Sequence, residues 1–303
     1  MRDIDYFIYD VFTDKALAGN PLAVVLNADG LSDAQMQAIA REFNLSETIF
    51  FQTPTDVSHS AKVRIFMPIG ELPFAGHPTV GGSVAFAGHH GLQPDAKVIL
   101  EEGVGPVHCN VSADQNAGHS SFIVPRISQQ QEFGESIEKV AAALGLNVAD
   151  IGFGEHTLSL WSAGVPFIMV PVKGIAVLQR LDLDAQSWLK LDVRREGKIA
   201  AAYIYASDRH SGINSYRARM FAPWDGMPED PATGAAAAAF SGAVWQAEGL
   251  VSGRHEVVIH QGVEMGRPSR INLHLEGDAG NLTRATISGN AVKVAEGKLF
   301  LPD

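Results

Sequence analysis

The alternation of apolar and polar positions along the chain predicts many short strands and a few helices. Segments rich in β-branched and aromatic residues with partial alternation predict strands, among them SETIFFQ (46–52), AKVRIFMP (61–68), KIAAAYIYA (198–206) and NSYRARMFAP (214–223). LSDAQMQAIAREFNL (31–45) instead predicts an amphipathic helix, because Met36, Ile39, Ala40 and Phe43 share one face and Ser32 with Gln35 forms a capping box.

Two further helices are expected to be buried on every side. TVGGSVAFAG (79–88) and TGAAAAAFSGAVW (233–245) have no polar face, and neither is long enough to span a membrane. Their small residues allow close approach of neighbouring strands. We therefore expect a curved sheet around each helix.

The chain contains an internal repeat of three landmarks in the same order. GNPLAVV (19–25) matches GVPFIMV (164–170), RIFMP (64–68) matches RMFAP (219–223), and the GHPT segment (76–92) matches the EDPATG segment (229–250). The repeat predicts an α+β fold of two pseudo-symmetric halves. We place the boundary near the polar stretch 112–120, which gives halves 1–118 and 119–303 with terminal strands that can cross between them.

In this alignment a titratable residue directly precedes a proline at the start of each buried helix: His77 before Pro78, and Asp230 before Pro231. The first backbone N–H groups of a helix lack internal partners and attract anions. If the halves pack about a pseudo-twofold axis, both helix starts face one cleft suited to a small carboxylate, with His77 and Asp230 able to transfer protons there. The alternative is that the two residues only cap their helices, which suits aspartate better than histidine.

A third candidate lies in NLSETIFF (44–51), where Ser46 and Glu47 fall between a helix and a strand. Polar residues at such a junction commonly form a turn. A carboxyl group flanked by Leu45, Ile49 and Phe50 can also be desolvated enough to accept and return a proton near neutral pH.

Composition narrows the class of protein. Hydrophobic residues make up 46% of the chain and charged residues 19%, which is typical of a well-packed protein. The net charge of −11 and the lack of a basic run make nucleic acid and a membrane surface poor partners. The first residues alternate like a strand and lack signal-peptide features, so we expect a cytoplasmic protein.

The only cysteine, Cys109, excludes an internal disulfide, a thiolate metal cluster and racemase chemistry that needs two thiols. In GPVHCNV it occupies an alternating apolar position, so we expect a buried side chain with a packing role.

Over almost the whole chain, the sequence resembles the PhzF-like (phenazine biosynthesis) isomerase family. The motifs that carry the resemblance are, in chain order, GNPLAVV, NLSETIFF, ELPFAGHPTVGG, RMFAP with EDPATG, and QGVEMGRPSRI. The resemblance implies a diaminopimelate epimerase-like fold, a homodimer, and catalysis without a metal or organic cofactor. The family's characterised member isomerises trans-2,3-dihydro-3-hydroxyanthranilate by moving a proton within the ring.

The resemblance also implies roles for individual residues. Glu47 would remove a proton from carbon and redeliver it, while His77 and Asp230 would orient the substrate and manage its charge. Ser46, Gly76, Gly234 and Ala235 would bind the substrate, and the two glycines would let the backbone come close to its carboxylate. Ala235 stands where the family commonly has serine, so the substrate of this chain can differ.

Other activities fit less well. The histidines show no HExxH spacing for a metal, no GxSxG elbow exposes a serine for a hydrolase, and GFGEH (152–156) lacks the third glycine of a dinucleotide-binding motif. Two alternatives remain open: a catalytically silent carboxylate-binding protein on the same fold, and an epimerase of an unidentified metabolite.

Overall fold

The computed structural model describes residues 2–195, 197–208 and 214–301, which form two compact units. The first unit contains Met1–Ile123 and Ser288–Asp303, and the second contains Val124–Ile287. The chain thus divides after Ile123 instead of residue 118, and its C-terminal segment returns to the first unit. Each unit is a curved mixed sheet around one buried helix, which confirms the α+β class and the two similar halves.

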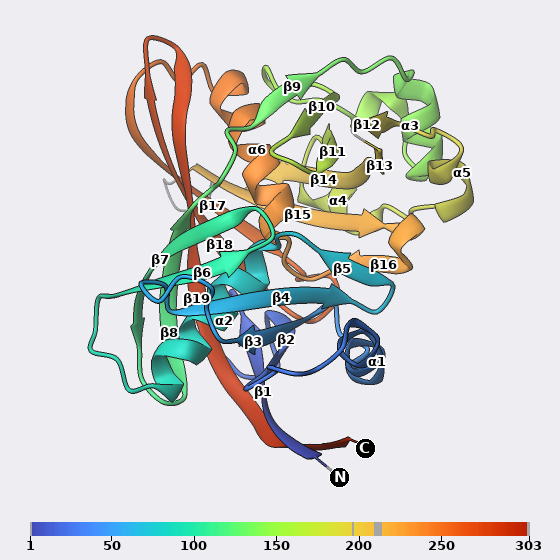
Figure 1. The fold of residues 1–303 in the computed structure, drawn as a ribbon. Helices are drawn as coiled ribbons and strands as arrows, with labels where there is room; N and C mark the ends of the chain where they lie inside the picture. Colours follow the sequence, from blue (N-terminus) through green and yellow to red (C-terminus); the bar gives the residue numbers. More distant parts are fainter. Residues whose placement is uncertain (1, 196, 209–213, 302–303) are drawn as a thin grey trace. The chain divides into compact units, whose positions relative to one another are not determined.

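The first unit is a closed ring of strands. The ring runs β1–β2–β3–β4–β6–β7–β8–β19 and back to β1, with β5 added beside β4. The strands, labelled in Figure 1, are β1 (Arg2–Val11), β2 (Asn20–Val25), β3 (Glu47–Gln52), β4 (Ala61–Met67), β5 (Gly70–Leu72), β6 (Ala96–Glu102), β7 (Gly105–Ala113), β8 (Ala117–Ile123) and β19 (Asn281–Leu301). The pairs β2–β3 and β4–β6 are parallel.

Helix α2 (Gly76–His89) fills the interior of this ring, packing against β1, β2, β3, β6, β7 and β8. Its small residues are required by the close packing. A Cβ atom added at Gly81 would lie 2.5 Å from Val11 Cγ2, and one at Gly82 would lie 2.7 Å from Ile49 Cδ1. The expectation of a helix buried on all sides is confirmed.

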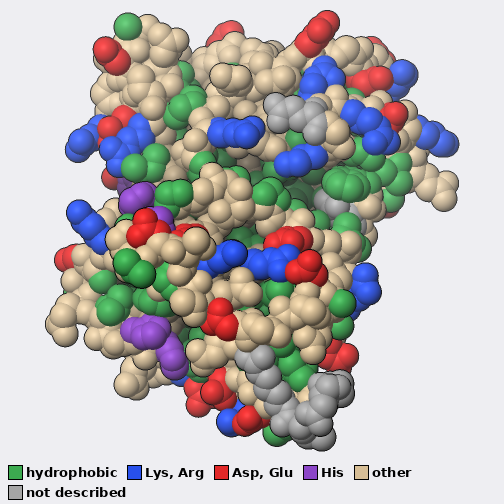
Figure 2. All heavy atoms as spheres, viewed as in Figure 1, with side chains coloured by type: hydrophobic (Ala, Val, Ile, Leu, Met, Phe, Trp, Pro, Cys, Tyr) green, Lys and Arg blue, Asp and Glu red, His purple; other side chains and the backbone are tan. Residues whose placement is uncertain are grey.

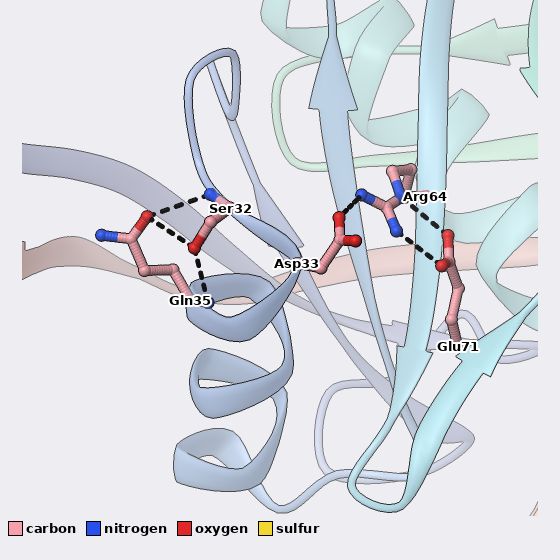
Figure 3. Close-up of polar contacts among 5 residues, drawn as sticks. All are labelled: Ser32, Asp33, Gln35, Arg64 and Glu71. Carbon is pink, nitrogen blue, oxygen red and sulfur yellow. Dashed lines mark hydrogen bonds and ion pairs between the residues drawn. The ribbon is translucent and has the colours of Figure 1, made fainter.

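Helix α1 (Asp33–Phe43) lies outside the ring, and its predicted face is the buried one. Met36, Ile39 and Ala40 pack with Phe50 and Phe66 from β3 and β4. The capping box is present, with Ser32 Oγ accepting from Gln35 N at 3.2 Å and Gln35 Oε1 accepting from Ser32 N at 3.0 Å (Figure 3).

Arg64 fixes the start of α1 and the β4–β5 hairpin. Figure 3 shows its guanidinium between Asp33 and Glu71: Nη1 lies 2.5 Å from Asp33 Oδ1, and Nε and Nη2 bond the two Glu71 oxygens at 2.7 and 2.5 Å. The two-pronged contact with Glu71 has the planar geometry that favours arginine over lysine.

The second unit repeats this plan. Its strands are β9 (Gln129–Gln131), β10 (Ser159–Ser162), β11 (Pro166–Pro171), β14 (Ala201–Ser207), β15 (Asn214–Ala222), β16 (Met227–Asp230), β17 (Gly253–Gln261), β18 (Ser269–Asp278) and the first residues of β19, with a small hairpin of β12 (Arg194–Arg195) and β13 (Lys198–Ile199). Helix α6 (Gly234–Ala247) packs against β9, β10, β11 and β18. The short helices α3 (Ile137–Ala143), α4 (Ile175–Arg180) and α5 (Ala185–Leu189), with the 3₁₀ turns η1 (Val148–Asp150) and η2 (Pro223–Asp225), complete the unit.

The order and direction of strand pairing are the same in both units. In the first unit β1–β2 is antiparallel, β2–β3 parallel, β3–β4 antiparallel, β4–β6 parallel and β6–β7 antiparallel. In the second unit β10–β11, β11–β14, β14–β15, β15–β17 and β17–β18 follow in the same sequence of directions. This common order allows each residue of one unit to be matched to its counterpart in the other.

The strand register corrects one part of the sequence repeat. Ile65 of RIFMP pairs with Leu72, and its counterpart Met220 of RMFAP pairs with Asp230. Asp230 therefore corresponds to Leu72, and not to His77. The salt bridge of Arg219 with Glu229, in which Nε lies 2.8 Å from Oε1, repeats that of Arg64 with Glu71 and fixes the same register.

The surface shows no segregation of charge on the face drawn in Figure 2, where acidic and basic side chains are interspersed. Within the described ranges, no helix has both the length and the apolar character needed to cross a bilayer.

Candidate active site

A tight turn before β2 places the buried side-chain amide of Asn20 at the site in the first unit. Gly19 has φ +67°, and a Cβ atom there would lie 2.4 Å from the Val11 carbonyl oxygen, so only glycine fits. The next residue, Asn20, is fully buried, and its Nδ2 lies 3.5 Å from His77 Nδ1. The GNP motif therefore places a polar side chain beside the histidine, a role that the sequence did not reveal.

Glu47 and His77 lie in direct contact. Glu47 is the first residue of β3 and His77 the second residue of α2. His77 Nδ1 lies 3.1 Å from Glu47 Oε2, and the two side chains are 3% and 12% exposed. The pair is thus largely desolvated while the carboxyl group keeps some access to solvent.

The imidazole of His77 is neutral at physiological pH. Complete burial lowers its pKa to about 3, and the backbone carbonyl of Pro21 offsets only part of this effect. A separation of 3.1 Å would also fit an ion pair with a protonated ring, but desolvation of the whole imidazole outweighs the attraction. In this state the ring carries one N–H: an Nδ1 that holds the hydrogen faces the Glu47 carboxylate, whereas an Nδ1 without it can accept from Asn20 Nδ2.

The start of α2 provides backbone donors next to this pair. Thr79 N donates to the Ala75 carbonyl at 3.1 Å, so the N–H groups of Gly76 and His77 precede the first intrahelical bond. The N-cap residue is Ala75, which supplies no side-chain cap. Ser46 lies directly before β3. Because His77 lies inside the first turn, it is not a capping residue.

The second unit holds Asp230 in its own hydrogen-bond cluster. Asp230 ends β16 and is 4% exposed, and the Thr233 hydroxyl donates to its Oδ2. Gln261 Nε2 donates to the Asp230 carbonyl at 2.8 Å and to Thr233 Oγ1 at 3.0 Å, and Gln261 Oε1 accepts from Thr233 N at 3.3 Å. Helix α6 begins only at Gly234, with Thr233 as its N-cap. The interpretation of Asp230 as an N-cap is therefore wrong.

Gly234 and Ala235 are the first two residues of α6. Ala237 N is the first amide of this helix to bond within it, to the Thr233 carbonyl at 3.0 Å, so the N–H groups of Gly234 and Ala235 have no intrahelical acceptor. Each helix start thus has backbone donors of the kind that bind carboxylates.

A comparison of matched positions in the two units shows which polar side chains are common to both units and which occur in only one. The contacts Leu22–Glu47 and Phe167–Ala201 are equivalent, so the counterpart of Glu47 is Ala201. His77 corresponds to Ala235, because each is the second residue of its helix. Asn20 corresponds to Val165, because each is the middle residue of its Gly-x-Pro turn.

The fold therefore tolerates small apolar residues at all three positions of the Asn20–Glu47–His77 cluster, whereas both units keep the arginine–glutamate pair. The shared plan of strands and helix thus does not itself call for polar side chains at these positions, which makes the cluster the candidate site for chemistry. The earlier inference that His77 and Asp230 are two copies of one repeated device is wrong, because the halves contribute different residues.

Cys109 has the packing role expected of it. It is 1% exposed on β7, and burial raises the pKa of its thiol to about 12, so it is not a nucleophile. Among the residues that the structure describes, no group of three histidine, cysteine, aspartate or glutamate side chains is arranged to hold a metal ion.

Known proteins resemble this chain over its full length. An uncharacterized isomerase of Mesorhizobium japonicum is 45% identical, covering 99% of this chain and all of its own. The trans-2,3-dihydro-3-hydroxyanthranilate isomerase of Pseudomonas chlororaphis is 33% identical, covering 98% of this chain and 99% of its own. A PhzF-family crystal structure from Bacillus anthracis has a TM-score of 0.87 and 26% identity, covering 99% of this chain and 100% of that one.

The fold has two similar units, each built around a buried helix. Together with these relatives, it shows that the protein is an isomerase of the epimerase-like fold class. The sequence profile described as phenazine biosynthesis-like protein matches residues 9–297. The chain belongs to this family, the PhzF family, as its motifs indicated.

Proposed function

We propose that this protein is a cofactor-independent isomerase that moves a proton between carbon atoms of a small cyclic or amino/hydroxy carboxylic acid. The observation that carries the proposal is the Glu47–His77 contact of 3.1 Å, a desolvated carboxyl group beside an imidazole that stays neutral. A neutral partner leaves the pair with the single negative charge that a general base needs.

In the proposed step, the Glu47 carboxylate takes a proton from a substrate carbon, and the bonding pair moves into the adjacent unsaturated system. The resulting Glu47 carboxylic acid then returns the proton to a different carbon, so no net proton or electron is consumed. His77 Nδ1 stays beside the Glu47 carboxyl group in both states, and Asn20 Nδ2 contacts the same ring nitrogen. Desolvation raises the basicity of a carboxylate, which suits abstraction from carbon.

Substrate binding is assigned to the helix starts. The N–H groups of Gly76, Gly234 and Ala235 are suited to a carboxylate, and Asp230 to an amine or hydroxyl group. Because Ala235 offers no hydroxyl, we propose a substrate that differs from trans-2,3-dihydro-3-hydroxyanthranilate at or near its carboxylate. This compound, the substrate in the name of the Pseudomonas chlororaphis relative, remains the first to test.

Glu47→Gln tests the mechanism. The amide keeps the size and hydrogen bonding of the side chain but cannot accept a proton, so deuterium incorporation from D₂O into candidate substrates should fall by at least about a hundredfold. The matched control is Glu71→Gln in the β4–β5 hairpin, which should retain exchange. Full exchange in the Glu47→Gln variant would overturn the role of Glu47.

The second candidate is a protein that binds small carboxylates without turnover. The same experiment separates the two, because such a protein would show ligand binding by calorimetry and no deuterium incorporation. An epimerase would instead exchange a proton at one carbon with inversion and form no positional isomer. The homodimer implied by the resemblance and the cytoplasmic location expected from the first residues are further proposals, the first of which sedimentation equilibrium tests.

A further inference from the structure

Glu102, at the end of β6, is a buried carboxyl group that the proposed reaction does not use. Its side chain is 8% exposed, and its Oε1 lies 2.8 Å from the Thr79 hydroxyl in the first turn of α2. The same hydroxyl lies 2.8 Å from the Ala75 carbonyl oxygen. Glu102 therefore contacts the turn of α2 that carries His77.

The hydrogen-bond inventory favours a protonated Glu102. A hydroxyl has one hydrogen, and in a helix threonine commonly donates it to the carbonyl four residues earlier, here Ala75. The Thr79 hydroxyl lies within bonding distance of both oxygens, and its single hydrogen serves only one of them; when it goes to Ala75, the carboxyl group of Glu102 supplies the hydrogen of its own contact with Thr79. In addition, Glu102 Oε2 is buried with no hydrogen-bond partner among the described residues, which a charged oxygen tolerates poorly.

The second unit carries an uncharged counterpart at the same position. Lys62 pairs with Glu101 in the first unit, and Arg217 with His260 in the second, so the next residues, Glu102 and Gln261, correspond. Gln261 hydrogen-bonds both the backbone and the hydroxyl of Thr233 at the start of α6. In each unit a planar hydrogen-bonding group from the strand thus holds the start of the buried helix.

We propose that Glu102 is a positioning residue, kept as a neutral carboxylic acid, that holds the first turn of α2 and with it His77, and whose ionisation releases that turn. The positioning role rests on the proposed function, whereas the protonation state does not.

The electrostatic surroundings agree with this assignment. Burial raises the pKa of Glu102 to about 8, against a smaller lowering by Thr79. The thiol of Cys109 on β7, which burial holds protonated, offers no positive charge.

A cavity of about 400 Å³ reaches Glu102 and is also lined by Lys62, Arg64, Glu71 and Glu101. Arg64 is bound to Glu71 and Asp33, and Glu101 to the backbone of Thr55 and Asp56. The cavity gives protons a route to Glu102, and its charges at Arg64, Glu71 and Glu101 are engaged elsewhere.

The pH dependence of turnover tests the positioning role. Wild-type exchange should decline as the pH rises through about 8, and in Glu102→Gln this decline should move upward by about one pH unit or more, because the amide cannot ionise. Glu102→Ala should lower exchange at pH 7 by roughly tenfold, and glutamine should rescue it. An unchanged alkaline decline in Glu102→Gln would overturn the role.

Two measurements need no substrate and remain decisive if isomerase activity fails. Infrared difference spectra between pH 7 and pH 9 should show loss of a protonated-carboxyl band in the wild type that is missing from Glu102→Gln. The ¹⁵N resonances of the His77 ring should shift over the same pH range in the wild type only. A wild type without either change would show that Glu102 is ionised at pH 7 or does not act on His77, and would refute the proposal.

Discussion

Replacing Glu102 by glutamine should make the protein more stable, and increasingly so as the pH rises. The folded state holds the carboxyl group with a pKa of about 8, whereas its ordinary value is 4.5. A raised pKa means that the folded state binds the proton more tightly than the unfolded state does. The stabilisation is therefore fully present below pH 4.5 and is lost as the pH rises through about 8.

The size of the effect follows from linkage. Between these two pKa values, the free energy of unfolding of the wild type should fall by about 1.4 kcal/mol per pH unit relative to the variant, giving at most about 5 kcal/mol at pH 8 and above. This difference is comparable to the whole stability of many domains. Glutamine keeps the shape and can still bond Thr79, as Gln261 does with Thr233 in the second unit.

Urea unfolding of both proteins at half-unit pH steps from 4 to 9 measures this difference, since all other titrating groups cancel between them. The slopes with respect to urea should agree, which shows that the same surface is exposed on unfolding. Gln261→Glu is the reverse variant and should create a similar pH-dependent loss. A difference between wild type and Glu102→Gln that does not change with pH would refute the neutral carboxyl group.

Three further variants probe the first unit. Gly19→Ala should cost roughly 1–3 kcal/mol in urea unfolding because of the positive φ and the Val11 carbonyl, and an unchanged midpoint would refute the strained turn. Asn20→Val, which copies Val165 of the other unit, should lower exchange at least about tenfold while the unfolding free energy stays within about 1 kcal/mol; equal activity would exclude a role in orienting His77. His77→Gln should remove up to about 5 kcal/mol of acid destabilisation between pH 6.5 and about 3, because the folded state disfavours the imidazolium; unfolding curves at pH 4 and 7 test this.

Much of the fold follows from local pattern. The apolar faces of α1 and of the two buried helices are read directly from residue spacing, and the capping box of Ser32 and Gln35 is a local sequence feature. The match of GHP with EDP was wrong because short motifs do not determine register. The pairing of Met220 with Asp230 does, and it matches Pro231 with Pro73, each three residues before the first residue of its helix, and not with Pro78.

The site was only partly predictable for the same reason. Motifs select Glu47 and His77 as candidates, but their contact depends on where β3 and α2 meet, which is a long-range property. Asn20, Glu102 and Gln261 were missed, although a comparison of matched repeat positions shows an asparagine opposite a valine and an acid opposite an amide. Their roles emerge only when burial and hydrogen-bond partners are known.

The single strand β19 makes the N-terminal unit the last to be completed during synthesis. Its residues from Ser288 onward close the first ring by pairing with β1 and β8. Until they leave the ribosome, the edges of those strands remain open, while the sequence of the second unit is already complete. A chain truncated after residue 287 should therefore fold its second half and leave its first half sensitive to protease, so the unit that is translated first is the last that can be completed.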